Sequence, residues 1–315
     1  ILLTRSSGTL QEPKPLTLHE TGASPIRDLA RAWLIGRQDA PFFLFLNFMD
    51  AHTPYLPPQE YRARFGSKGP EIEWIGFPDD LYTAALFDGR PMPKKDVAYA
   101  LSQYDAALAY LDGQVSRLIQ DLKDLGLFEE TLIVIVSDHG EAFWEHGVME
   151  HGSTLYDPQV RVPLLIKLPA AALGDSMAPS AYMQHVDFLP TIAEVLQIEP
   201  PPGVQGSAWG RGRDYALAEN YVHWGRPARF HHELVAVESQ RLKYVYSTAG
   251  VEEVFDPAND PQEVQNLFDA MPEFVTRMRE IRKVRDLWLR DSLIKQQPDR
   301  EDERMREKLR SLGYL

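Results

Sequence analysis

An apolar run that turns polar at its end lies near the middle of the chain, in the sequence TLIVIVSDHGE at residues 131–141. Its apolar part, residues 131–136, is short and rich in β-branched side chains, as expected of a buried strand. Asp138 and His139 follow almost at once. Because ligands in open α/β sheets bind beyond the carboxyl ends of strands, the segment predicts both a sheet and a site at its edge.

Similar segments lie on both sides of this one. Residues 42–48 and 162–168 are further apolar runs without alternation, which is typical of strands covered on both faces in a parallel sheet. Helices are expected at residues 27–36, 96–125 and 186–196, and Gly126 is placed to end the second of them. Alternating strands and helices predict an α/β fold with a doubly wound, mainly parallel sheet flanked by helices.

The pattern changes after the proline-rich residues 200–203. Short strand-like pieces separated by tight turns predict a small antiparallel sheet, and they occupy residues 215–221, 232–238, 243–247 and 253–256. Helices rich in Arg and Glu, at residues 277–290 and 300–308, close the chain. We therefore expect an α/β domain over residues 1–208 and a C-terminal subdomain, with a small antiparallel sheet plus helices, over residues 209–315.

The composition narrows the possible functions. The chain has 315 residues and a formal net charge of −13, which argues against binding nucleic acid or an anionic membrane over a broad surface. It has no cysteine, so disulfides, thiolate metal sites and cysteine nucleophiles are excluded for this chain. Its longest apolar runs are far shorter than the ~20 residues that a membrane-spanning helix needs, so no transmembrane segment is predicted.

Histidines gather in the loops that follow the predicted strands. His52 follows the first strand, His139 the second, and His146 and His151 lie in a glycine-punctuated loop before the third. Asp138 and His139 offer a carboxylate oxygen and an imidazole nitrogen, which form a workable pair of metal ligands. Taken singly, Asp138 could instead cap the next helix and a loop histidine could simply be solvated. Their clustering favours a hydrolytic or metal site.

Four stretches of the chain resemble the sulfatase family of the alkaline-phosphatase superfamily. They are FLFLNFMDAHTPY at residues 43–55, TLIVIVSDHGE at 131–141, the segment from His151-Gly152 to Val162-Pro163-Leu164, and the segment from Val254-Phe255-Asp256-Pro257 to Asn266-Leu267. They occur in the family's order and spacing, and the resemblance covers roughly residues 27–315.

This resemblance implies hydrolysis of a sulfate ester, of a small molecule or a carbohydrate, with one divalent cation, usually calcium, and a formylglycine nucleophile. By position, Asp138 and His139 would bind the metal, and His52 and His151 would be catalytic residues that contact the sulfate and the leaving oxygen. Tyr55 and His146 are candidate substrate-binding residues. Many members have Asn in place of His139 and Lys in place of His151. An imidazole ligand suits manganese or zinc better than calcium.

The family's nucleophile motif, Cys/Ser-x-Pro-x-Arg, is not found in the chain. Its three Pro-x-Arg sequences have Ala23, Gly225 and Gln296 at the nucleophile position. We therefore expect this chain to be the C-terminal portion of a longer sulfatase-like protein, inactive by itself. The alternatives are a phosphonate monoester or phosphodiester hydrolase of the same superfamily and a sulfatase-like protein without catalysis. The resemblance favours a periplasmic or secreted location over a cytoplasmic one, and the sequence indicates no oligomeric state.

Overall fold

The computed structural model describes residues 2–3, 22–37, 40–66, 91–172, 182–211, 214–221, 231–239 and 241–295. The chain forms two compact units, the first of residues 1–214 and 220–232 and the second of residues 215–219 and 233–315. The helix predicted at residues 300–308 lies outside the described residues. None of the described helices combines the length and the apolar character needed to cross a membrane.

The three predicted strands of the first unit are present but short. β2 (Leu44–Phe45) pairs with β1 (Leu2–Leu3), and β3 (Ile133–Val136) pairs with β6 (Leu164–Lys167). Both pairs are antiparallel, whereas their unbroken apolar sequences suggested parallel neighbours. Unbroken apolar runs are typical of parallel strands, but they are also compatible with antiparallel pairing. Leu165 of β6 is 58% exposed, so this strand is not covered on both faces in the described chain.

The long helix α4 (Lys94–Asp124) confirms the helix predicted at residues 96–125. Gly126 follows it with a φ of +70°, and its amide donates to the carbonyl of Lys123 at 3.0 Å, as expected of a residue that ends a helix. The buried face differs in part from the apolar pattern, because Leu101 is 41% exposed while the smaller Ala106 and Ala107 are buried. Small side chains let neighbouring elements approach α4 closely.

Helix α1 (Ala23–Leu34) packs against α4 and begins four residues before the predicted start at Arg27. Asp50 accounts for the early start, because its Oδ1 accepts a hydrogen bond from the Ala23 amide at 3.1 Å. Gly22, at the N-cap position, has no side chain to do this. Burial raises the pKa of Asp50. The contact ties the start of α1 to the loop that leads to His52.

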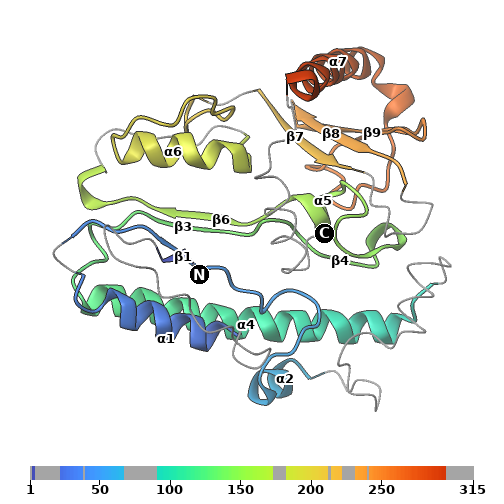
Figure 1. The fold of residues 1–315 in the computed structure, drawn as a ribbon. Coiled ribbons are helices and arrows are strands. Elements are labelled where there is room, and N and C mark those ends of the chain that lie inside the picture. The colour runs from blue at the N-terminus through green and yellow to red at the C-terminus, as the bar shows by residue number, and fades with distance from the viewer. Residues whose placement is uncertain are drawn as a thin grey trace. The chain divides into compact units, whose positions relative to one another are not determined.

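The remaining elements of this unit are short. They are α2 (Gln59–Phe65), β4 (Ala142–Phe143), β5 (Met149–Glu150), α5 (Asp157–Val160) and α6 (Phe188–Val195). In Figure 1, α1 and α4 lie on one side of the β3–β6 ribbon and α6 lies on the other, which gives a layered α/β arrangement. Helix α6 starts two residues after the predicted position, because residues 185–187 form a 3₁₀ turn closed by reciprocal capping between Gln184 and Asp187.

The second unit contains the predicted antiparallel sheet, in the order β10-β9-β8-β7. Its strands are β7 (Tyr215–Asn220), β8 (Leu234–Ser239), β9 (Leu242–Ser247) and β10 (Glu252–Phe255). Helix α7 (Pro272–Lys295) packs on the sheet through a core that includes Val237, Tyr244, Val254, Val275 and Met278. This confirms the small C-terminal antiparallel sheet followed by a helix.

Candidate active site

The loop after β3 has a fixed backbone. The Ser137 hydroxyl donates to the carbonyl of His139 at 2.6 Å, and the Gly140 amide donates to the carbonyl of Gln159 at 2.8 Å. A Cβ atom at residue 140 would lie 2.1 Å from the carbonyl oxygen of Pro158, so only glycine fits there. The strand end and these bonds hold Asp138 and His139 in place.

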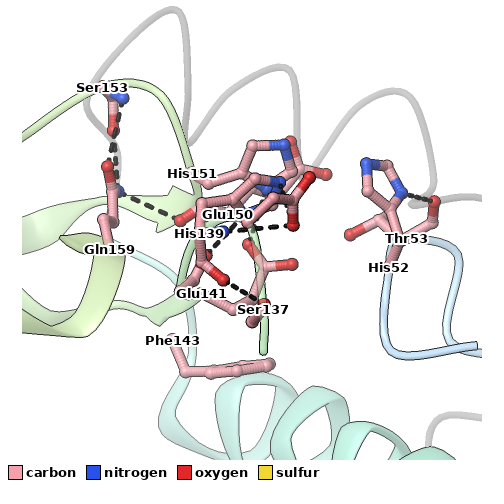
Figure 2. A network of polar contacts seen from close by, with 12 residues as sticks. His52, Thr53, Ser137, His139, Glu141, Phe143, Glu150, His151, Ser153 and Gln159 are labelled. Carbon is pink, nitrogen blue, oxygen red and sulfur yellow. Dashed lines mark hydrogen bonds and ion pairs between the residues drawn. The ribbon is translucent and has the colours of Figure 1, made fainter. Parts of the chain in front are cut away.

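Three imidazole rings lie together at this position (Figure 2). The rings of His139 and His151 stack with centroids 3.8 Å apart and planes at 25°. The His52 ring centroid is 5.1 Å from that of His151 and 6.4 Å from that of His139. The structure therefore brings together three predicted residues from three separate loops.

A buried glutamine holds the loop around His151. Gln159 is 3% exposed, and its Oε1 accepts hydrogen bonds from the amides of Ser153 and Thr154 at 3.1 and 3.0 Å. Its Nε2 donates to the carbonyl of Glu150 and to the hydroxyl of Ser153, both at 3.0 Å (Figure 2). These four bonds fix the backbone on both sides of His151.

A carboxylate also contacts His151 directly. Glu141 Oε1 lies 3.1 Å from His151 Nδ1, and the Glu141 side chain is only 5% exposed. Burial, followed by the nearby Glu141 carboxylate, raises the pKa of the Tyr55 phenol. The Glu141 carboxylate thus lies close both to His151 and to the buried phenol of Tyr55.

The two candidate substrate-binding residues lie in different surroundings. Tyr55 is 8% exposed and packs in a core cluster with Phe143 and Met149, so its position favours a supporting role. His146 is exposed and stacks on Tyr156, with ring centroids 3.6 Å apart and planes at 12°. Contact of either residue with substrate stays a prediction.

Asp138 and His139 together suit a divalent cation. His139 Nδ1 is 2.9 Å from the carbonyl oxygen of Gly140, so Nδ1 carries the proton and Nε2 keeps its lone pair. His139 Nε2 is 3.8 Å from Asp138 Oδ1, a separation that one ion can bridge because metal bonds to N and O are about 2.0–2.2 Å long. Within the described residues, no three His, Asp or Glu side chains are grouped to bind a metal. The pair therefore fits part of a metal shell.

Sequence reasoning missed several residues that support the site. Glu141 lies within the quoted motif, and its closeness to His139 was the available signal, but the sequence does not show that its partner is His151. Gln159 carried no signal. His185 was also missed, and its Nε2 donates to the carbonyl of Ser137 at 2.8 Å, just before Asp138 and His139.

The α/β fold is shared with the solved structures of sulfatases and of other members of the alkaline-phosphatase superfamily. The Sulfatase family model matches residues 9–198, and the chain belongs to the sulfatase family. Residues 144–286 also match the model for the C-terminal region of N-sulphoglucosamine sulphohydrolase. The predicted family and its α/β fold are confirmed.

Individual relatives are distant. The chain is 26% identical to an arylsulfatase of Clostridium perfringens over 263 residues, and this alignment covers 78% of the chain and 52% of the relative. It is 28% identical over 192 residues to an N-acetylglucosamine-6-O-sulfatase of Bacteroides thetaiotaomicron, covering 58% of the chain and 34% of the relative. The crystal structure of a phosphonate monoester hydrolase of Agrobacterium radiobacter superposes with a TM-score of 0.66 at 21% identity, over 85% of the chain and 60% of that structure. The chain spans about half the length of the curated relatives it matches.

Proposed function

We propose that these residues form part of the active site of a sulfuric ester hydrolase that acts on a sulfate ester of a small molecule or a carbohydrate. The observation that carries the proposal is the convergence of His52, His139 and His151 from three loops, with ring centroids 3.8–6.4 Å apart. Membership of the sulfatase family and similarity to an arylsulfatase and a sugar sulfatase support it.

Asp138 and His139 would hold the divalent cation that the family uses. When bound, such an ion offsets negative charge on the sulfate oxygens. The imidazole of His139 favours manganese or zinc over the calcium that is usual in the family. Titration of the chain with Ca²⁺, Mn²⁺ and Zn²⁺ by calorimetry, for wild type and Asp138→Ala, tests which ion this pair helps to bind.

His52 and His151 would contact the sulfate oxygens and the leaving oxygen. Protonated imidazoles stabilise the charge that builds on the transferred group, and one of them gives its proton to the departing alkoxide. No residue of the chain matches the family's Cys/Ser-x-Pro-x-Arg nucleophile motif, so the proposal covers the metal-binding and acid-base residues only. A periplasmic or secreted location stays a prediction from the family resemblance.

The test uses the complete product of the gene and 4-nitrophenyl sulfate as substrate. His52→Ala and His151→Ala are each expected to lower kcat by about 10²–10⁴-fold, the usual contribution of a positioned acid. Asp28→Ala is the control, because Asp28 lies on helix α1 and its side chain is 60% exposed. Turnover that is unchanged in both histidine variants would refute the proposed roles.

A second candidate is a phosphonate monoester or phosphodiester hydrolase on the same scaffold. The observation in its favour is an imidazole at residue 139, since such a nitrogen suits manganese or zinc better than the calcium usual in sulfatases. Comparing kcat/KM for an aryl sulfate and an aryl phosphonate on the same protein distinguishes the two candidates. A clear preference for the phosphonate would replace the first proposal, and no turnover of either would favour a non-catalytic protein.

A further inference from the structure

Glu141 has no role in the chemistry described so far. It lies two residues after His139, just before β4, and its side chain is 5% exposed. A carboxylate is rarely buried to this degree unless it is paired. Glu141 Oε1 lies 3.1 Å from Nδ1 of His151 (Figure 2), and the carboxylate is also close enough to Tyr55 to raise the pKa of its phenol.

This contact selects one form of the imidazole. A neutral imidazole carries a proton on only one of its two nitrogens, and an ionised carboxylate can only accept a hydrogen bond. Nδ1 of neutral His151 therefore carries the proton that Glu141 accepts, and Nε2 is the nitrogen that takes up and gives the second proton when the ring is protonated. The neighbouring ring of His139 is set in the same way, because its Nδ1 donates to the backbone carbonyl of Gly140.

The contact also fixes the direction of the ring. Rotation about the Cβ–Cγ bond of His151 would move Nδ1 away from Glu141 and break the stacking on His139. Gln159 independently holds the backbone on both sides of His151, so His151 can move only by rotation about its side-chain bonds. Removing a carboxylate that orients a metal-bound imidazole typically costs about 10–100-fold in affinity or activity, and we take this range as the guide for the same contact to His151.

We propose that Glu141 is a positioning residue that holds His151 in the Nδ1–H tautomer, with Nε2 directed toward the ester. The last step rests on the proposed function, because it assumes that His151 contacts the substrate. The tautomer itself does not depend on that assumption, and it can be measured in the chain without turnover.

The test is ¹⁵N NMR of the histidine-labelled full chain at about pH 8, where imidazoles are ordinarily neutral. The His151 signal is assigned by its loss in His151→Asn. Wild type is expected to show the Nδ1–H form, and Glu141→Ala is expected to shift His151 toward the Nε2–H form or a mixture. Glu141→Gln keeps the side-chain volume and covers the case in which the alanine variant does not fold. Its amide can donate to Nδ1, so it too is expected to lose the single Nδ1–H form.

Glu130→Gln is the control, since Glu130 is exposed in the turn before β3. An Nε2–H tautomer in wild type, or an Nδ1–H form that persists in both Glu141 variants, would overturn the inference. The second readout is turnover by the complete gene product, where Glu141→Gln is expected to lower kcat by about 10–100-fold with KM nearly unchanged. A changed tautomer with unchanged kcat would keep Glu141 as the residue that orients His151 and would refute the catalytic role of His151 instead.

Discussion

Replacing Gln159 by Met tests how the His151 loop is held. Methionine has a similar length but makes none of the four hydrogen bonds of Gln159, which each contribute about 0.5–1.5 kcal/mol net. Four such bonds amount to about 2–6 kcal/mol. Thr154 and Glu150 are half-buried, so water can replace part of the loss, and we expect a destabilisation of about 2–4 kcal/mol.

The assay is urea unfolding combined with hydrogen exchange read by mass spectrometry, because exchange reports on residues 150–156 separately from the second unit. Gln114→Met is the matched control. Gln114 is also 3% exposed, but its Oε1 has no hydrogen-bond partner among the described residues. Exchanging a poorly satisfied amide for an apolar group is close to neutral, so we expect a change within about 1 kcal/mol. Equal losses in the two variants would refute the argument that the hydrogen bonds of Gln159 hold the loop.

Two further predictions concern buried charges. Burial raises the pKa of Asp50, so its ionised form destabilises the fold, and Asp50→Asn is expected to increase the free energy of unfolding at pH 7. In wild type, protonation of the Asp50 carboxyl stabilises the fold. This stability is fully present below the unfolded pKa of about 3.8 and is lost as pH rises through the higher pKa of the folded state. The urea midpoints of wild type and Asp50→Asn should therefore converge near pH 4. Lys243 and Glu263 form an ion pair of 2.7 Å with side chains 2% and 0% exposed, so Lys243→Met should cost about 3–5 kcal/mol. The double variant with Glu263→Met should regain most of that loss, and a double variant as unstable as the single one would contradict this account.

The sequence predicted elements where a periodic pattern and a clear end coincide. Helix α4 has both, since its apolar residues recur over many turns and Gly126 ends it. The start of α1 was missed because its cap comes from Asp50, which is distant in sequence. The antiparallel pairing of β3 with β6 was missed because an unbroken apolar run favours parallel strands without excluding antiparallel ones.

The site shows the same limit. His52, His139 and His151 could be found because each follows an apolar strand or lies in a glycine-punctuated loop, and the fold brings such loops together. The supporting contacts could not be found in this way. The pairing of Glu141 with His151 and the four bonds of Gln159 depend on how the loops fold back, which a residue pattern does not encode.

The ring contact between His52 and His151 joins segments roughly a hundred residues apart in the chain. Closing a loop of that length has an entropic cost that must be met before the contact forms, and contacts of this kind slow folding. The histidine cluster should therefore assemble late, after α4 and the β3–β6 pair. An NMR signal of the His151 imidazole that changes only when the His52 ring contacts it would mark the last step in the folding of the first unit. This step could be followed during refolding without measuring enzyme activity.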